Sequence, residues 1–377
     1  MRKRIKSIRI IISGGGTGGH VFPAIAIANA IKKRDPDADI LFIGAKGKME
    51  MHKVPAAGFE IRGLPISGFH RKLTLRNLSF PFKLLYSMFE SANIIREFEP
   101  DAVIGVGGYA SGPALQSATR KKIPTLIQEQ NSYPGVTNKI LAPKADKICV
   151  AYEGMERFFP AEKIILTGNP VRQDLQDLQN KKEEAIRYFS LKNDKTTLLV
   201  FGGSLGARTI NTSIVSCLKN KLTNANIQVI WQTGKGYYYD NSIDPSFSEN
   251  PDVRIFPFID RMDLAYACAD IIISRAGAIT ISELCIVGKP SILIPSPNVA
   301  EDHQTKNAET LFQKNAAIIL KNSEAPEKLE EAILSLSRNK DLQKTLSDNI
   351  KKLAVTNAAD RIVSELYELI NNKKKKA

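Results

Sequence analysis

Short apolar runs alternate with longer segments of helical spacing along the first half of the chain. An apolar, β-branched run at residues 8–12 leads into glycines, and a segment with helical spacing follows at residues 24–31. Further apolar runs of strand length lie at residues 40–43, 102–106 and 125–127. Strands that alternate with helices are typical of a parallel sheet covered by helices, so we predict an α/β domain here.

The same pattern starts again about half a chain later. An apolar strand predicted at residues 197–201 leads into the glycine-rich segment Gly202–Ala207, and a helix is expected from about Arg208. Further strands are predicted at residues 228–231, 271–273 and 291–294. A chain of 377 residues is also longer than a single hydrophobic core usually grows. We therefore predict two Rossmann-like α/β domains.

The boundary between the two domains is expected near Gly168–Arg172. Pro170 and the residue before it favour an extended connection at this point. We predict a first domain at residues 1–168 and a second domain at residues 169–357. A helical pattern at about residues 358–371 is expected to pack back on the first domain.

Composition and charge narrow the class of protein. Apolar residues make up 43% and charged residues 24% of the chain, as in folded soluble proteins. The net charge is +14, and +11 of it lies in residues 1–168, so this half is predicted to face an anionic surface, either nucleic acid or lipid headgroups. Aromatic residues are not interleaved with the basic ones and no nucleic-acid-binding motif is recognised, so we predict no nucleic-acid partner.

Membrane contact is predicted to be peripheral, because no apolar run approaches the roughly 20 residues that a spanning helix needs. Residues 71–85 interleave cations with large apolar side chains, which favours a patch at an anionic membrane surface. An amphipathic helix on the core, disturbed by Pro81, explains this segment equally well. The four cysteines form no C-x-x-C pair, so we predict buried, reduced thiols in a cytosolic protein.

The first glycine-rich segment, Gly14–His20, follows a strand and opens a helix. Backbone N–H groups and the helix dipole in this position receive a phosphate or another electron-rich group, whereas a tight turn alone explains only one or two of the glycines. The spacing also satisfies the G-x-G-x-x-G of dinucleotide-binding folds. That fold needs an acidic residue at the end of the next strand, yet this strand ends in Gly44–Lys46, so dinucleotide binding is a minor alternative and we predict no cofactor.

Two similar segments lie in the second half. Ser204, within Gly202–Ala207, could bond a phosphate oxygen or cap its own helix. Ser274–Glu283 places small residues at a helix start, where a ligand can approach free N–H groups. Glu283 would lie about one turn into that helix. Its carboxylate could accept bonds from two ribose hydroxyls, or could only interact with the positive end of the helix dipole.

A metal site is not expected. The four histidines show no metal-ligand spacing, and Asp35, Asp37 and Asp39 precede a strand instead of ending one, so we predict a surface turn for these carboxylates. A leaving diphosphate would then be neutralised by helix ends and side chains.

A series of motifs in matching order between residues 14 and 304 resembles one family. The motifs are Gly15–Pro23, Gly107–Pro113, Gln128–Asn131, Gly168–Arg172, Gly202–Ala207, Ser274–Glu283 and Asp302–Gln304. Each motif alone is a moderate signal, but their joint occurrence is highly specific. The sequence is similar to the MurG family of UDP-N-acetylglucosamine:undecaprenyl-pyrophosphoryl-muramoyl-pentapeptide N-acetylglucosaminyltransferases.

The resemblance implies two Rossmann-like domains that face a central cleft, the GT-B type of glycosyltransferase. It implies an inverting, metal-independent enzyme of peptidoglycan biosynthesis at the cytoplasmic face of the cell membrane. UDP-N-acetylglucosamine would bind mainly to the second domain, and the lipid-linked acceptor, undecaprenyl-pyrophosphoryl-muramoyl-pentapeptide, to the first. A UDP-sugar epimerase on the same plan, or another GT-B transferase with a lipid acceptor, is the alternative.

The resemblance also implies roles for individual residues. Ile259 would meet the uracil through its backbone, Glu283 the ribose, and Gln304 the sugar. The diphosphate and the rest of the nucleotide would be held by Ser204, Ala278, Ile279, Thr280 and Arg172. From the first domain, the sugar or the acceptor's pyrophosphate would be contacted by Thr17, Gly18, Gly19 and Asn131.

Inversion by a single displacement requires a base that takes the proton of the acceptor's 4-hydroxyl. His20 is the candidate, because a helix N-terminus favours the neutral imidazole, which can accept a proton. A role of His20 in binding substrate or a nearby loop is the competing interpretation, and Glu129 is the reserve base.

Overall fold

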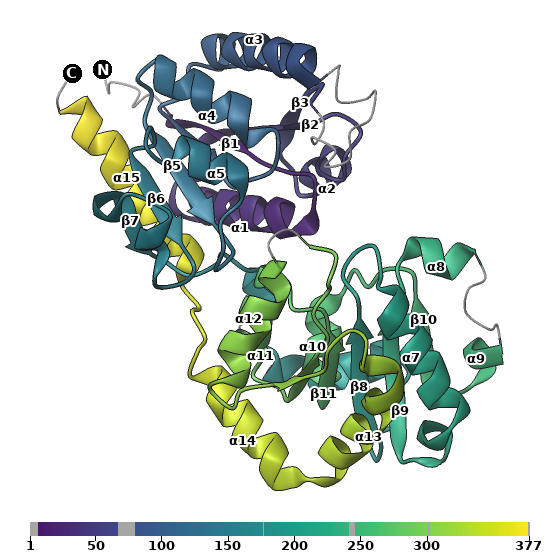
Figure 1. Cartoon of the computed structure of the whole chain (residues 1–377). Coiled ribbons are helices and arrows are strands. Elements are labelled where there is room, and N and C mark those ends of the chain that lie inside the picture. The colour runs from purple at the N-terminus through teal and green to yellow at the C-terminus, as the bar shows by residue number, and fades with distance from the viewer. Residues whose placement is uncertain (1–6, 67–79, 176, 241–245, 300–301, 376–377) are drawn as a thin grey trace. The chain divides into compact units, whose positions relative to one another are not determined.

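The computed structural model describes residues 7–66, 80–175, 177–240, 246–299 and 302–375. Contacts divide the chain into two compact units, residues 1–172 with 357–377 (unit 1) and residues 173–356 (unit 2). Each unit contains one parallel sheet with helices on both faces (Figure 1). The two Rossmann-like domains expected from the alternation of strands and helices are therefore confirmed.

Unit 1 contains a seven-stranded sheet of order β3-β2-β1-β4-β5-β6-β7, in which all neighbouring strands are parallel. Its strands are β1 (Arg9–Ser13), β2 (Asp39–Ala45), β3 (Glu60–Leu64), β4 (Ala102–Gly105), β5 (Thr125–Glu129), β6 (Lys147–Val150) and β7 (Ile164–Leu166). Its helices are α1 (Gly18–Arg34), α2 (Glu50–Ala56), α3 (Phe80–Phe98), α4 (Ser111–Arg120), α5 (Val136–Leu141) and α15 (Ala358–Lys374).

Alternate residues of β1 point into the two cores of unit 1. Ile10 and Ile12 pack with residues of α1 and α15, whereas Ile11 packs with residues of α3, α4 and α5. Both faces of the strand are covered, which is why its sequence is an uninterrupted apolar run. The C-terminal helix α15 lies against α1, and Lys147 on β6 forms ion pairs with Glu365 and Glu368 of α15.

Unit 2 contains a six-stranded parallel sheet of order β10-β9-β8-β11-β12-β13. Its strands are β8 (Thr196–Phe201), β9 (Ile227–Gln232), β10 (Val253–Phe256), β11 (Ile271–Ser274), β12 (Ser291–Leu293) and β13 (Ile318–Ile319). Its helices are α6 (Lys182–Tyr188), α7 (Arg208–Lys219), α8 (Lys235–Tyr239), α9 (Ser246–Glu249), α10 (Met262–Cys268), α11 (Ala278–Val287), α12 (His303–Phe312), α13 (Ala325–Arg338) and α14 (Lys340–Lys351).

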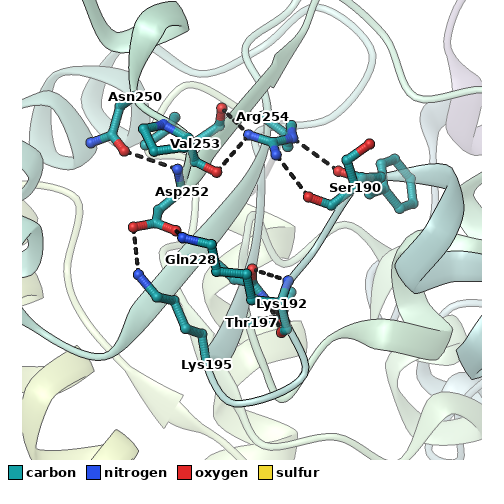
Figure 2. Close-up of polar contacts among 11 residues, drawn as sticks. Ser190, Lys192, Lys195, Thr197, Gln228, Asn250, Asp252, Val253 and Arg254 are labelled. Carbon is teal, nitrogen blue, oxygen red and sulfur yellow. Dashed lines mark hydrogen bonds and ion pairs between the residues drawn. The ribbon is translucent and has the colours of Figure 1, made fainter.

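A polar network closes the amino end of this second sheet (Figure 2). Asp252 pairs with Lys192 and Lys195, and the hydrogen bond with Lys195 holds the pKa of the Asp252 carboxyl below its ordinary value. Arg254 donates to two backbone carbonyls of the segment after α6, and Gln228 donates to the carbonyl of Lys192. These contacts join the starts of β8, β9 and β10. The carboxyl end of the sheet lies opposite, where ligands of open α/β sheets bind.

The strands predicted from the sequence are all present, but β3, β6, β7, β10 and β13 were not predicted. Four of these five are edge strands. Their side chains are only partly covered, so they lack the continuous apolar run of a central strand. The turn predicted at Asp35–Asp39 is confirmed between α1 and β2 for Asp35 and Asp37, whereas Asp39 is the first residue of β2. Pro81 does not disturb α3, because it lies in the first helical turn, where the missing N–H has no intrahelical partner to lose.

The predicted state of the cysteines is confirmed as well. All four are free and buried, and burial raises the pKa of each thiol to about 12. These thiols therefore stay protonated and inert at neutral pH. Among the described residues, no helix is both long and apolar enough to cross a membrane.

Candidate active site

A cavity of about 380 Å³ opens at the carboxyl end of the sheet of unit 2. It is lined by residues that follow β8, β11, β12 and β13, by the first residues of α7, and by one residue each of α8 and α12. These residues are Gly202, Gly206, Ala207, Arg208, Thr209, Tyr237, Arg275, Ser296, Pro297, Asn298, Gln304 and Asn322. The free N–H groups and the positive dipole end of a 12-residue helix thus border the cavity, which suits an anionic ligand.

Arg275 adds a positive charge to this cavity. Its Nη1 donates to the carbonyl oxygens of Ile294 and Pro295, both at 2.9 Å, and to Oδ1 of Asn322 at 2.8 Å. These acceptors are neutral, so they hold the side chain in place without compensating its charge. Burial lowers the pKa of Arg275, but a guanidinium stays protonated at neutral pH. Arg208 also lines the cavity, so two arginine residues border it.

Glu283 lies on α11 and is buried, with 7% of its surface exposed. The hydroxyl of Tyr266, on α10, donates to Oε2 of Glu283 at 3.0 Å. Tyr266 is itself fully buried and packs edge-on against Phe201. The carboxylate is therefore held in one orientation by a rigid neighbour, as a group that recognises a pair of hydroxyls requires.

Gln232, at the end of β9, joins two loops of unit 2. Its Oε1 accepts from the backbone N–H of Ile259 at 2.8 Å, and its Nε2 donates to the carbonyl of Gly203 at 3.0 Å. Ser204 follows Gly203 in a turn that Gly206 N closes on Gly203 O. One buried amide therefore links the backbone of Ile259 to the glycine turn beside the cavity.

In unit 1, two glycine-rich loops meet at the carboxyl ends of β1 and β4. A Cβ atom at Gly108 would lie only 2.3 Å from the carbonyl oxygen of Gly15, and Gly108 has a φ of +84°. Only glycine permits both this backbone conformation and this close approach. The loop at Gly14–Gly19 therefore packs backbone to backbone against Gly107 and Gly108.

His20 lies in the first turn of α1, next to this junction. Its Nδ1 is 3.1 Å from the carbonyl oxygen of Gly15 and 3.3 Å from Oγ1 of Thr17. A carbonyl oxygen can only accept, so the bond to Gly15 places the hydrogen on Nδ1. The lone pair then resides on Nε2, which lies over Gly107.

Glu129, at the end of β5, is 1% exposed and accepts four hydrogen bonds. The donors are N and Nδ2 of Asn131 at 3.0 and 3.2 Å, N of Gly135 at 3.1 Å and Nδ2 of Asn138 at 2.8 Å. Four donors fill the lone-pair sites of an ionised carboxylate. Glu129 is thus built into the turn that carries Asn131, which makes it a poor candidate for a proton acceptor.

Glu50 is a second buried carboxylate, and sequence reasoning did not find it. Its Oε2 accepts from the backbone N–H of Gly16 at 2.9 Å, and its Oε1 accepts from that of Ala45 at 3.0 Å. Glu50 is the first residue of α2, but its carboxylate reaches the end of β2, where a dinucleotide-binding fold places its ribose acid. Both of its oxygens accept from the protein's own backbone. The N–H of Gly16 is likewise taken and does not face a phosphate.

The chain matches the glycosyltransferase family 28 N-terminal domain at residues 10–150 and the glycosyltransferase family 28 C-terminal domain at residues 197–362. It is 56% identical over 369 residues to the UDP-N-acetylglucosamine--N-acetylmuramyl-(pentapeptide) pyrophosphoryl-undecaprenol N-acetylglucosamine transferase of Parabacteroides distasonis, with 98% of this chain and 100% of the relative covered. The protein of the same name from Cytophaga hutchinsonii is 58% identical over 370 residues, with 98% and 99% covered. The chain belongs to this transferase family.

Solved structures agree. MurG from Acinetobacter baumannii matches with a TM-score of 0.72 at 28% identity, covering 96% of this chain and 99% of that chain. The expected MurG family, and with it an N-acetylglucosaminyltransferase, is confirmed. A UDP-GlcNAc 2-epimerase from Neisseria meningitidis bound to UDP-GlcNAc has a TM-score of 0.68 at 15% identity, covering 96% and 100%. At this identity, the similarity to the epimerase shows a shared fold and does not support the epimerase alternative.

The residues predicted from the MurG resemblance fall into two sets, one in each unit. Unit 2 contains Ser204, Ile259, Ala278, Ile279, Thr280, Glu283 and Gln304. Of these, Gln304 lines the cavity and its Oε1 accepts from the N–H of Ser296 at 2.8 Å, while Ala278, Ile279 and Thr280 form the first turn of α11. Ser204 does not cap α7, whose N-cap residue is Ala207.

Unit 1 contains the remaining predicted residues of this MurG-family chain: Thr17, Gly18, Gly19, His20, Glu129, Asn131 and Arg172. Thr17 is the N-cap residue of α1, which begins at Gly18. The guanidinium of Arg172 lies over the ring of Phe22 on α1, 5.7 Å from the ring centre. Arg172 therefore packs on α1 of unit 1.

Sequence reasoning missed several residues of the site. Arg208 directly follows the glycine-rich segment Gly202–Ala207, and Arg275 lies within Ser274–Glu283. A cation at the start of a predicted helix was the sequence signal that could have identified both as residues of an anion site. Gln232, Tyr266 and Glu50 carry no such signal, because their roles depend on partners far away in the sequence. Among the described residues, no group of three or more His, Cys, Asp or Glu is arranged to hold a metal ion.

Proposed function

We propose that this chain transfers N-acetylglucosamine from UDP-N-acetylglucosamine to the 4-hydroxyl of undecaprenyl-pyrophosphoryl-muramoyl-pentapeptide, the step from lipid I to lipid II in peptidoglycan biosynthesis. The observation that carries the proposal is the cationic cavity at the head of α7 in a chain whose relatives bear the name of this transferase. A nucleoside diphosphate is negatively charged and therefore complements the positive charge of this cavity.

On the donor side, unit 2 supplies the groups that recognise UDP and stabilise its departure. Glu283 accepts bonds from the ribose hydroxyls, and the carbonyl of Ile259 faces the base, since its N–H is bound to Gln232. Arg208, Arg275 and the helix starts of α7 and α11 stabilise the negative charge that develops on the diphosphate. Fixed cations and helix ends take the place of a metal ion.

On the acceptor side, Nε2 of His20 removes the proton from the 4-hydroxyl as its oxygen attacks the anomeric carbon. The bond between this oxygen and the anomeric carbon forms while the bond from that carbon to the phosphate oxygen breaks, and UDP leaves with the electron pair. A single in-line displacement of this kind inverts the configuration of the anomeric carbon. The tautomer held by Gly15 leaves Nε2 able to accept the proton.

The transfer is expected to proceed in excess chelator. Pure protein incubated with labelled UDP-N-acetylglucosamine and the lipid-linked acceptor should move label into the lipid fraction at a rate within about twofold of that with added Mg²⁺, because protein cations stabilise the leaving group. Label that stays in the aqueous phase, or that enters the lipid only with Mg²⁺, would contradict this mechanism. Conversion of the sugar nucleotide without acceptor would indicate epimerase chemistry instead.

The enzyme is proposed to work at the cytoplasmic face of the membrane through α3. Phe82, Leu85, Tyr86 and Phe89 follow the helical spacing i, i+3, i+4 and i+7, and all four side chains are exposed, with Phe82 exposed to 75%. Such a face, next to Lys83 and in a unit of positive charge, suits the interface of an anionic bilayer. The basic residues Arg71–Arg76 of the predicted patch lie outside the described residues.

Replacing both phenylalanines of this face should weaken membrane binding. The double variant Phe82→Ser/Phe89→Ser is expected to bind phosphatidylglycerol-containing vesicles about 10- to 100-fold more weakly in a sedimentation assay, because two aromatic side chains no longer enter the interface. Phe312→Ser, which removes an exposed phenylalanine of α12 in unit 2, is the matched control and should bind like the parent. Equal binding by the double variant and the parent would exclude α3 as the contact.

A further inference from the structure

The carboxylate of Glu50 is buried in unit 1 without an assigned function. It is the first residue of α2, is 1% exposed, and accepts one backbone N–H on each oxygen. Both donors are neutral amides from separate segments, the glycine loop at Gly16 and the end of β2 at Ala45. Burying a charged carboxylate that has only two neutral amides as partners costs free energy of folding. We therefore expect a role of Glu50 other than packing.

Glu50 and His20 bind opposite ends of the same peptide group. The amide nitrogen of Gly16 and the carbonyl of Gly15 belong to one peptide bond, which is planar, so the N–H and C=O point in opposite directions. Oε2 of Glu50 accepts from the N–H, and Nδ1 of His20 lies 3.1 Å from the carbonyl oxygen. Fixing the N–H therefore also fixes the direction of the carbonyl that His20 contacts.

This arrangement determines which nitrogen of His20 carries the hydrogen. The carbonyl of Gly15 requires a hydrogen on Nδ1, which leaves Nε2 as the proton acceptor. A carboxylate on the N–H also polarises the peptide and strengthens the carbonyl as an acceptor. The imidazolium that forms when Nε2 takes a proton is stabilised through the same bond.

Two glycines make room for this carboxylate. A Cβ atom at Gly15 would lie 2.1 Å from Oε1 of Glu50, and one at Gly44 would lie 2.6 Å from Cγ of Glu50. Neither position tolerates a side chain while Glu50 keeps its place. Gly15 and Gly44 are thus explained by the approach of Glu50, and not by contact with a phosphate.

We propose that Glu50 is a positioning residue of the transfer reaction, which acts through the Gly15–Gly16 peptide to hold His20 in its proton-accepting tautomer. The inference rests on the proposed function, in which His20 is the base. Glu50 itself touches neither substrate. Its effect is on the chemical step and not on the binding of UDP-N-acetylglucosamine, since the donor site lies in unit 2.

The test begins with Glu50→Gln, which keeps the shape of the side chain but replaces one acceptor oxygen by an NH₂ group. We expect kcat to fall about 10- to 100-fold, the usual effect of losing a group that orients a functional histidine, while KM for UDP-N-acetylglucosamine stays within about twofold. Glu60→Gln, an exposed carboxylate on β3 of the same unit, is the control and should retain the parent's kcat. An unchanged kcat in Glu50→Gln would overturn the proposal.

The tautomer can be observed directly. In ¹⁵N-histidine spectra, the signals of His20, assigned by their loss in His20→Ala, should show a protonated Nδ1 and an unprotonated Nε2 in the parent. In Glu50→Gln they should show a mixture of both tautomers. Identical spectra in the two proteins would contradict the proposed action on His20. If Glu50→Gln does not fold, Glu50→Asp, which keeps the charge but is too short to reach both amides, should show the same two changes.

A double-mutant cycle separates positioning from general stabilisation of the fold. In the His20→Ala background, adding Glu50→Gln should change kcat by less than about twofold, because the group through which it acts is gone. An equal loss in both backgrounds would overturn the proposal. If His20→Ala alone leaves kcat unchanged, His20 is not the base and the proposed function is contradicted. If His20→Ala lowers kcat but the effects of His20→Ala and Glu50→Gln on kcat are additive, His20 remains the base and only the role of Glu50 is contradicted.

Discussion

His20→Ala is expected to lower kcat by about 10³-fold, within the range that a positioned general base contributes. The reason is that, in the proposed mechanism, Nε2 of His20 accepts the proton of the 4-hydroxyl in the transition state, whereas the groups proposed to bind UDP belong to unit 2. Steady-state transfer of label from UDP-N-acetylglucosamine to the lipid acceptor gives kcat, and calorimetric titration with UDP gives the affinity. The affinity for UDP should stay within about twofold of the parent's.

Two further variants, one of another histidine and one of the reserve base, serve as comparisons for His20→Ala. His52→Ala removes an exposed histidine of α2 in the same unit and should leave kcat unchanged. Glu129→Gln tests the reserve base; because Glu129 holds the turn of Asn131 with four hydrogen bonds, we expect it to reduce thermal stability along with activity. A His20→Ala enzyme that loses UDP binding but keeps its kcat would assign His20 to recognition.

Glu283→Ala is expected to produce the opposite pattern, with the affinity for UDP falling about 100-fold and kcat at saturating donor changing much less. Hydrogen bonds to a charged acceptor contribute about 1.5–3 kcal/mol each, so the loss of one or two of them from a buried carboxylate accounts for this size. Calorimetric titration with UDP measures the effect. Glu309→Ala, an exposed carboxylate on α12 of the same unit, serves as the control.

The contribution of Glu283 can be assigned to the ribose with a modified ligand. The parent should bind UDP at least about tenfold more tightly than 2′-deoxy-UDP, whereas Glu283→Ala should bind the two alike, since the missing hydroxyl no longer has a partner. Glu283→Gln keeps an acceptor for the hydroxyl of Tyr266 and should fall between the parent and Glu283→Ala. If Glu283→Ala still binds UDP more tightly than 2′-deoxy-UDP, a residue other than Glu283 recognises the ribose hydroxyl.

The local sequence pattern was sufficient for the framework of both units. Uninterrupted apolar runs such as residues 8–12 and 197–201 indicate strands that are covered on both faces. Glycines directly after these runs indicate the turn into a helix. Edge strands such as β3 and β13 were missed because they are only partly buried and so lack that signal. Pro81 was misjudged because its effect depends on where the helix begins, which the pattern left open.

The sequence by itself determined the two α/β domains, the family, and the glycine-rich segments that follow the strands, because strand periodicity and glycine spacing are properties of neighbouring residues and the order of the motifs can be read along the chain. The tertiary structure alone decided what individual side chains do there. Glu50 lies next to Gly16, Gln232 next to Ile259, and Tyr266 next to Glu283 only after folding. A buried carboxylate or amide takes its role from the groups that satisfy its hydrogen bonds, and those groups come from distant parts of the chain.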